Sequence, residues 1–238
     1  MRPIRQVGFF HFGSMEKDDP VGSLEFEMAK YPEAQLRDSL LVLPEAFNAR
    51  GGYYNAAPAL DSDALPRLQR ISAERGIVFV AALVDRIKGP MSAYLLDGTA
   101  PPQWLTSKRT HGWRCLYTGS ETKEDRLIPH REVGIGALIC DDAACTFGDA
   151  QKLIVERIKN LMMKHTVLCI PSCMTITDSR GTASRWGNSI TVALANGSSS
   201  QASVLVHRGC ELRNACPFEN EIKLCDLDSA GVAEGDTD

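Results

Sequence analysis

The sequence predicts an α/β layered fold in a single domain. Apolar runs of strand length alternate with helix-like segments in the front and middle of the chain, and strand-like runs cluster towards its end. The chain has 238 residues, of which 44% are hydrophobic, so it can bury one large core. No stretch rich in proline, glycine or serine divides it. We therefore expect one domain over residues 1–228 and an acidic, mobile tail over residues 229–238.

The elements at the front of the chain alternate between strand and helix. Residues 4–10 indicate a first strand, and residues 21–39 have helical spacing that Pro32 interrupts. The run 40–43 is short and continuously apolar, which is typical of a strand buried on both faces. Residues 46–55 predict a loop because they are rich in glycine, asparagine and tyrosine.

A helix and a buried strand follow this loop. Apolar side chains recur at helical intervals over residues 61–75, with Asp61 or Ser62 as the expected N-cap and Gly76 as the expected end. Residues 77–84, IVFVAALV, form the clearest buried strand of the chain.

The rest of the chain contains one further helix and several strands. Residues 109–132 are polar and irregular, so we expect a loop region there, and residues 151–165 are amphipathic with helical spacing. The other runs of strand character cover residues 93–96, 104–107, 133–139, 167–170, 190–195, 202–207 and 221–227.

Composition and charge exclude several classes of partner. The net charge is -4 and the sequence pI is about 5.8, with no basic stripe for nucleic acid and no polybasic segment for an anionic membrane. No apolar run approaches the roughly 20 residues of a membrane helix, and residues 1–13 do not form a signal peptide. We therefore expect a cytoplasmic protein whose eight cysteines are reduced thiols. None of them forms a C-x-x-C pair, so we expect neither a metal, nor a cofactor, nor a redox role.

Three polar residues stand at the ends of expected strands. Glu45 follows LLVLP, Lys108 follows WLTS, and Cys140 ends VGIGALI. In α/β folds, functional sites gather where strands end. A cysteine thiolate is a strong nucleophile, a lysine ammonium lowers its pKa and stabilises a tetrahedral intermediate, and a carboxylate can move the protons. Together these residue types could cleave an amide or a nitrile without a histidine.

Each of these residues also has a purely structural interpretation. A cysteine at a strand end is commonly a buried structural thiol, Glu45 could begin a helix beside its dipole, and Lys108 could be solvated. Asp141 and Asp142 could cap the segment that follows Cys140. The residues alone leave open whether the three strand ends meet.

The order and setting of the motifs resemble the carbon–nitrogen hydrolase (nitrilase) superfamily. The motifs are LLVLPEAF, MSAYLLDG, LTSKR, VGIGALICDDA, LCIPS and ITVALANG, and the similarity extends from about Ile4 to Asp228. The resemblance implies a four-layer α-β-β-α sandwich that acts on a small molecule and assembles as a homodimer or a higher homo-oligomer.

The resemblance also implies a role for each site residue. Glu45 would be the general base, Lys108 would stabilise the tetrahedral intermediate, and Cys140 would be the nucleophile. The backbone N–H of Asp141 would help to bind the oxyanion, and Asp142 stands where members often carry an acidic residue.

The chain departs from the family pattern around the expected pocket. Many members carry a second glutamate that positions substrate, and here Glu121 and Glu124 compete for that place. The usual Lys-x-His motif reads KRTH, the residues AAC follow the aspartates where members often show an aromatic residue and an arginine, and the Arg-Ala-x-Glu-Asn pattern is reduced to RWGN. The identity of the substrate therefore does not transfer from a relative. The aromatic candidates for the pocket wall, which packing explains equally well, are Tyr53, Tyr54, Trp113 and Trp186.

These observations predict a hydrolase that cleaves a non-peptide carbon–nitrogen bond through a thioester on Cys140. A small amide or N-carbamoyl compound is favoured over a nitrile, because amidase-type members are commoner in the superfamily. The alternative, which the altered motif flanks favour, is a family-like scaffold that binds a ligand or partner without turnover. An acyltransferase would use the same thioester, but such members usually carry membrane segments, and none is expected here.

Overall fold

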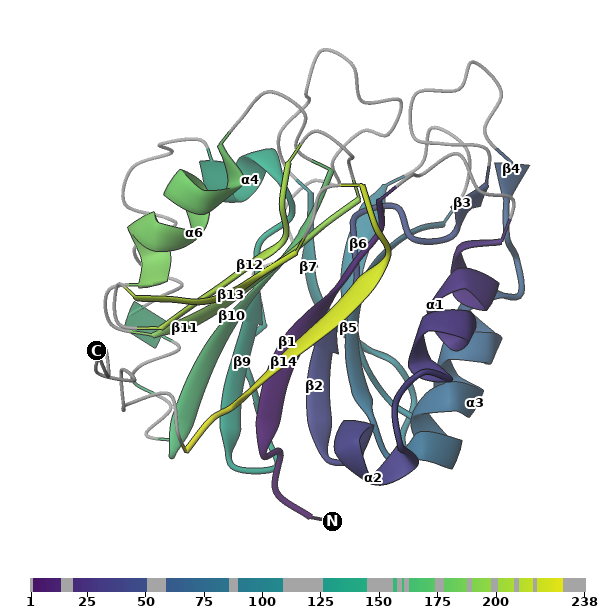
Figure 1. The fold of residues 1–238 in the computed structure, drawn as a ribbon, viewed down its shortest axis with the longest axis horizontal. Coiled ribbons are helices and arrows are strands. Elements are labelled where there is room, and N and C mark those ends of the chain that lie inside the picture. Colours follow the sequence, from purple (N-terminus) through teal and green to yellow (C-terminus); the bar gives the residue numbers. More distant parts are fainter. Residues whose placement is uncertain are drawn as a thin grey trace, which may run out of the picture.

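Two six-stranded β-sheets pack face to face at the centre of the computed structural model (Figure 1). The structure describes residues 2–13, 19–50, 59–85, 90–108, 126–144, 156, 157, 160, 163–173, 178–187, 190–197, 201–207, 210–215 and 218–228. The strands of the first sheet are, in spatial order, β14 (Glu221–Asp226), β1 (Gln6–His11), β2 (Ser39–Val42), β5 (Val78–Val84), β6 (Met91–Asp97) and β7 (Gln103–Ser107). Those of the second sheet are β13 (Cys210–Asn214), β12 (Val204–His207), β11 (Thr191–Asn196), β10 (His165–Ser172), β9 (Val133–Ala137) and β8 (Ile128–His130). A small separate sheet pairs β3 (Ala49–Arg50) with β4 (Ala59–Leu60).

Helices cover the outer faces of both sheets (Figure 1). Beside the first sheet lie α1 (Pro20–Met28) and α3 (Ala64–Arg75), and the short α2 (Glu33–Leu36) leads into β2. Beside the second sheet lie α4 (Asp141–Ala144) and α6 (Ser179–Gly187). The layers confirm the predicted four-layer α-β-β-α sandwich. Within the described ranges, no helix is long and apolar enough to cross a membrane.

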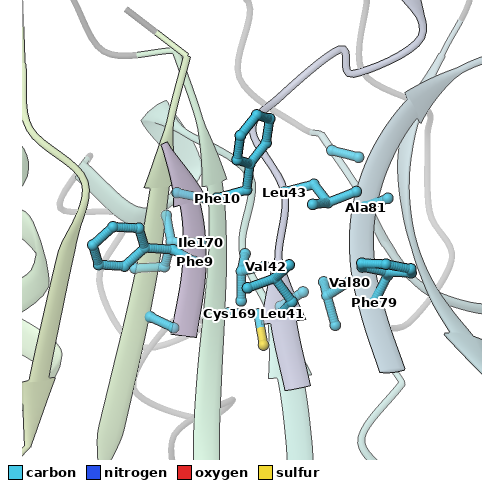
Figure 2. Packing of buried hydrophobic residues seen from close by; sticks show 14 of the residues in the cluster. Phe9, Phe10, Leu41, Val42, Leu43, Phe79, Val80, Ala81, Cys169 and Ile170 are labelled. Atoms are coloured by element: carbon cyan, nitrogen blue, oxygen red, sulfur yellow. The ribbon is translucent and has the colours of Figure 1, made fainter. Parts of the chain in front are cut away.

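The central strands are buried on both faces, because each lies between the facing sheet and a helical layer. Every residue of β2 and β5 is buried. Figure 2 shows Phe9, Val42, Phe79 and Ile170, which come from both sheets, in the packed core. Burial of one such side chain contributes about 1.5–3 kcal/mol to folding. The core therefore holds the two sheets, and with them the strand ends, in fixed relative positions.

The strands that carry the predicted site all end at one edge of the sandwich. In the first sheet β1, β2 and β5 are parallel, and two antiparallel pairings return β7 to the same direction. In the second sheet β9, β10 and β11 are parallel. Backbone groups join the sheets at this edge, because the Glu45 N–H donates to the Ser172 carbonyl at 3.3 Å and the Phe12 N–H to the Asn196 carbonyl at 3.2 Å.

A buried charged cluster joins the sheets at the opposite edge. Nη2 of Arg131 donates to both carboxylate oxygens of Asp97 at 2.9 Å, and His130 Nε2 lies 2.9 Å from Asp97 Oδ2. Burial keeps the pKa of His130 below its usual value. Burial alone would raise the pKa of Asp97, but Arg131 and hydrogen bonds from Thr99 outweigh it and lower that pKa.

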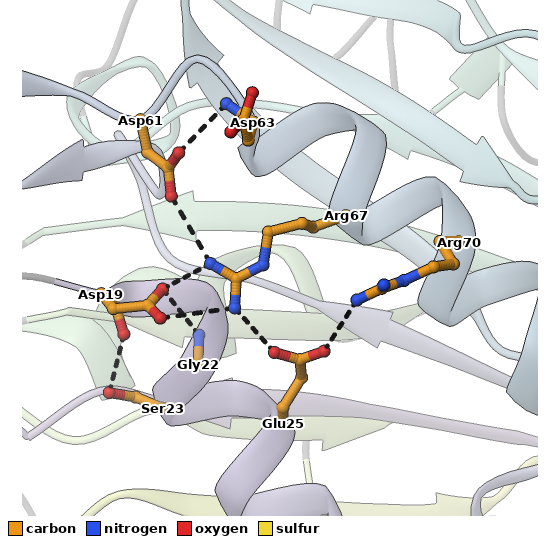
Figure 3. Close-up of polar contacts among 8 residues, drawn as sticks. All are labelled: Asp19, Gly22, Ser23, Glu25, Asp61, Asp63, Arg67 and Arg70. Carbon is orange, nitrogen blue, oxygen red and sulfur yellow. Dashed lines mark hydrogen bonds and ion pairs between the residues drawn. The ribbon is translucent and has the colours of Figure 1, made fainter.

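A partly solvated network of charged side chains joins α1 to α3 (Figure 3). Arg67 donates to both oxygens of Asp19, at 2.8 and 3.3 Å, and to Glu25 at 2.7 Å, and Arg70 donates to Glu25 at 3.4 Å. Asp19 also caps α1 by accepting a hydrogen bond from the Gly22 N–H at 2.8 Å. Exposed pairs of this kind contribute about 0–1 kcal/mol each, so the network orients the two helices while the core supplies most of the stability.

The helix predicted over residues 61–75 is confirmed as α3. It ends at Gly76, whose φ of 68° is the left-handed conformation that glycine adopts without strain. The N-cap is Asp63, so the prediction of Asp61 or Ser62 was wrong. Asp61 instead accepts a hydrogen bond from the Asp63 backbone N–H at 3.0 Å, which forms the turn just before the helix.

Several elements differ from the predictions. No helix was expected where α6 lies, and β3 falls inside the loop predicted over residues 46–55. β8 falls inside residues 109–132, which we expected to be a loop, and β13 was not predicted at all. β8 and β13 form the two opposite edges of the second sheet and carry polar or exposed residues, so they lack the apolar pattern of a buried strand. The helix expected over residues 151–165 ends earlier than predicted, because His165 begins β10. The tail over residues 229–238 lies outside the described residues, and the extent of the domain stays a prediction.

Candidate active site

Cys140 occupies a sharp turn between β9 and α4. Its φ is 48°, a left-handed conformation that costs a residue with a Cβ about 1–3 kcal/mol. Two backbone hydrogen bonds hold the turn: the Cys140 N–H donates to the Pro171 carbonyl and its carbonyl accepts from the Ala143 N–H, both at 2.9 Å. The side chain is enclosed, because the residue is only 4% exposed. The thiol is thus fixed at the strand end, as the sequence predicted.

The Glu45 carboxylate and the Lys108 ammonium form a buried ion pair. Lys108 Nζ donates to Glu45 Oε1 at 2.5 Å, and the two side chains are 2% and 0% exposed. The backbone on both sides continues the sheet, because the Phe47 N–H donates to the Ala82 carbonyl at 3.0 Å and the Lys108 N–H to the Met91 carbonyl at 2.9 Å. The solvated interpretation of Lys108 is therefore wrong.

The charges of this ion pair act on the Cys140 thiol. Burial raises the pKa of Cys140 well above its usual value, and the negative charge of Glu45 raises it further. Lys108 and a hydrogen bond from the Cys173 backbone N–H to the sulfur act in the opposite direction but do not outweigh burial. Sequence reasoning anticipated only the lowering by lysine. The structure thus places the Cys140 thiol within reach of both charges of the buried Glu45–Lys108 pair.

The two aspartates after Cys140 have different surroundings. Asp142 is 5% exposed, and its N–H donates to the Ile139 carbonyl at 3.0 Å. Asp141 Oδ1 accepts a weak hydrogen bond from the Cys140 sulfur at 3.9 Å. Within the described part of the chain, the Asp141 N–H donates to no backbone carbonyl, and its role in binding an oxyanion stays a prediction.

Two side chains of α6 hold α4 in place from the outer layer. The Trp186 indole N–H donates to the Ala143 carbonyl at 3.0 Å, and Arg185 Nη1 donates to the Ala144 carbonyl at 2.8 Å. A four-residue helix leaves its carbonyls without partners of its own, so these side chains satisfy them. Trp186 therefore packs against the segment that carries Cys140.

The remaining predicted site residues lie outside the described residues. They are the two candidate second glutamates and three of the four candidate aromatic walls, namely Glu121, Glu124, Tyr53, Tyr54 and Trp113. Among the described residues, no three histidine, cysteine or acidic side chains lie close enough together to hold a metal ion.

Ser172, the last residue of β10, and Cys173, which follows it, contact the site although sequence reasoning assigned them no role. The Ser172 carbonyl accepts the Glu45 N–H, and the Cys173 N–H donates to the Cys140 sulfur. The motif LCIPS could have indicated them, because its apolar run stops at a polar residue, as the runs before Glu45 and Cys140 do. Only the parallel pairing of β9 with β10 shows that these ends are neighbours.

The sequence matches no protein-family model and no curated protein. The fold, in contrast, matches solved structures over nearly its whole length. A cysteine-to-alanine mutant of the Nesterenkonia AN1 amidase from the nitrilase superfamily aligns with a TM-score of 0.65 and 18% identity, covering 97% of this chain and 93% of that one. This chain has the nitrilase-superfamily fold.

Two further structures share the nitrilase-superfamily fold with this chain. One is a glutamate-to-glutamine mutant of the Nesterenkonia sp. AN1 amidase with acrylamide joined to its active-site cysteine by Michael addition. It has a TM-score of 0.68 and 18% identity, over 94% of this chain and 93% of that one. The other is the same type of mutant with the acetamide moiety of fluoroacetamide attached to that cysteine. It has a TM-score of 0.69 and 19% identity, over 98% of this chain and 94% of that one. At this identity the likeness establishes the fold.

Proposed function

We propose that the protein belongs to the nitrilase superfamily and hydrolyses a small amide or an N-carbamoyl compound through a thioester on Cys140. The observation that carries the proposal is the buried Glu45–Lys108 ion pair, whose two charges both act on the Cys140 thiol. A nucleophile, a carboxylate and a fixed cation are the groups that acyl transfer requires. A nitrile is the less favoured substrate.

In the first half-reaction, Glu45 takes the proton of Cys140 as the sulfur attacks the carbonyl carbon. The base is needed because burial raises the pKa of the Cys140 thiol well above its usual value and so disfavours the thiolate. Negative charge develops on the carbonyl oxygen, where the Lys108 ammonium and the Asp141 N–H would stabilise it. Glu45 then returns the proton to the leaving nitrogen, the carbon–nitrogen bond breaks, and a thioester remains on Cys140.

In the second half-reaction, a water molecule attacks the thioester carbon while Glu45 takes one of its protons. The carbon–sulfur bond breaks, the acid leaves, and the proton returns from Glu45 to the Cys140 sulfur. Lys108 stays charged throughout and stabilises both tetrahedral intermediates. Asp142, buried behind the nucleophile, would hold the turn in place.

The solved relatives support the choice of chemistry. In glutamate-to-glutamine mutants of the Nesterenkonia amidase, acrylamide and the acetamide moiety of fluoroacetamide are joined to the active-site cysteine, which shows that small amides reach a reactive cysteine in that protein. Small amides are therefore the first compounds to test here. As further parts of the proposal, Glu121 or Glu124 positions the substrate, and the protein acts in the cytoplasm as a homodimer or a higher homo-oligomer.

The test is a screen for ammonia release from small aliphatic amides, N-carbamoyl amino acids and nitriles. We expect release from at least one amide or carbamoyl compound, and loss of release in Cys140→Ser. The matched control is Cys225→Ser, which changes a half-buried thiol on β14 and should keep wild-type turnover. Saturable binding of these compounds without any ammonia release would instead support the non-catalytic scaffold.

A further inference from the structure

The backbone around Ser172 contacts both Glu45 and Cys140 of the proposed catalytic cluster. Its carbonyl accepts the Glu45 N–H at 3.3 Å and the Gly197 N–H at 3.0 Å. The residue before it, Pro171, accepts the Cys140 N–H, and the residue after it, Cys173, donates its N–H to the Cys140 sulfur. The backbone of Ser172 is thus fixed beside both the base and the nucleophile.

The Ser172 hydroxyl has no hydrogen-bond partner among the described residues, although the residue is 0% exposed. Leaving a buried hydroxyl without a partner costs about 1–3 kcal/mol. Other buried serines of the chain are satisfied; Ser39, for example, donates to the Leu36 carbonyl at 2.5 Å. Ser172 is bonded through its backbone to Glu45, and its enclosed hydroxyl has no partner among the described residues, so the hydroxyl is suited to bind a small molecule that enters during the reaction.

We propose that the Ser172 hydroxyl positions the water molecule that hydrolyses the Cys140 thioester. Water is small and can both accept from and donate to a hydroxyl. Glu45, held by the Ser172 carbonyl, is the group that must take the proton of that water. The step balances: the water oxygen bonds to the acyl carbon, the carbon–sulfur bond breaks, and the proton passes through Glu45 to the sulfur. The inference rests on the proposed function and adds a positioning residue to it.

This role predicts a specific kinetic pattern for Ser172→Ala. Formation of the thioester does not use the hydrolytic water, so kcat/KM, which reports the steps up to release of ammonia, should stay within about twofold of wild type. Thioester hydrolysis should slow by about tenfold or more, because a bound and oriented reactant is replaced by a mobile one. As a result kcat and KM should fall together, and ammonia should appear in a burst.

The experiment combines rapid-quench ammonia assays with intact-protein mass spectrometry. Acyl-enzyme should accumulate in Ser172→Ala but not in wild type, and Ser172→Thr, which keeps a hydroxyl, should restore hydrolysis. Melting temperatures separate this role from a structural one. Ser172→Ala should melt at or slightly above the wild-type temperature because an unsatisfied group is removed, whereas Ser39→Ala, which loses a hydrogen bond, should melt lower.

Several outcomes would overturn the inference. A fall in kcat/KM without accumulated acyl-enzyme would assign Ser172 to the first half-reaction or to the structure, and a raised KM with unchanged kcat would assign it to substrate binding. Unchanged kinetics would remove any role. If wild type releases no ammonia from any of the screened substrates, the proposed function fails, and the role of Ser172 fails with it.

Discussion

Replacing Lys108 by methionine should destabilise the protein strongly, because it leaves the Glu45 carboxylate buried without its cation. Both side chains are almost fully enclosed, at 2% and 0% exposure, so solvent cannot take over the role of the ammonium. Breaking a buried pair by removing one partner typically costs about 3–5 kcal/mol. For a domain of this size, 1 kcal/mol corresponds to about 2–4 °C in Tm, so the melting temperature should fall by roughly 6–20 °C.

The double variant Glu45→Gln with Lys108→Met provides the decisive comparison. It removes both charges, so it should recover much of the stability lost in Lys108→Met, even though neither protein is active. Urea unfolding of the wild type, both single variants and the double variant gives the four free energies of unfolding that a double-mutant cycle requires. A surface control is Lys223→Met, whose 3.5 Å pair with Glu221 is partly exposed and should be worth less than about 1 kcal/mol.

Two results would refute this reasoning. The first is a loss in Lys108→Met no larger than in the surface control, which would mean that water reaches Glu45. The second is a double variant no more stable than Lys108→Met, which would mean that packing of the lysine stem, rather than the charge, is what matters.

Three further predictions concern proton transfer, acid stability and the support of the turn. In Glu45→Gln, alkylation of Cys140 by iodoacetamide should rise about tenfold per pH unit between about pH 7 and 9, because burial still raises the pKa of the thiol and only solvent is left to take its proton. The alkylation rate of wild type should depend less steeply on pH. Peptide mass spectrometry measures the rates, and an equal pH dependence in the two proteins would exclude Glu45 as the base. Because burial lowers the pKa of His130, the unfolded chain binds a proton before the folded protein does. The resulting stability is complete above the usual histidine pKa of 6.5 and declines as the pH falls below it. The melting temperature of His130→Gln should therefore fall less than that of wild type between about pH 7 and 5. An equal fall in both proteins would contradict this. Trp186→Phe removes the hydrogen bond to Ala143 and should cost about 1 kcal/mol in urea unfolding and slow ammonia release. Loss of stability with full turnover would show that α6 does not position the nucleophile.

The sequence predicted the strand ends of the site because their apolar runs are continuous and stop abruptly. Glu45 and Cys140 each follow such a run, and buried strands of this kind have a strong local signal, whereas Lys108 follows the more polar segment WLTS. Edge strands have a weaker one. β13 reads CELRN and exposes most of its side chains, so only its pairing with β12 identifies it as a strand.

The burial of Lys108 and the surroundings of Ser172 could not be predicted, because both depend on contacts between distant segments. Lysine is usually solvated, and nothing local shows that Glu45, 63 residues away, supplies the carboxylate that permits its burial. Ser172 ends a strand like many serines do. Its role depends on Glu45 from the other sheet and on Cys140 from the neighbouring strand.

The left-handed backbone at Cys140 has a consequence for the residues that this position tolerates. Glycine adopts that conformation freely, whereas a residue with a Cβ is disfavoured there. Glycine and alanine both remove the buried sulfur, so Cys140→Gly, which also relieves the backbone, should unfold at higher urea than Cys140→Ala. Under the proposed function, the chain tolerates a strained backbone here in exchange for a fixed and reactive thiol.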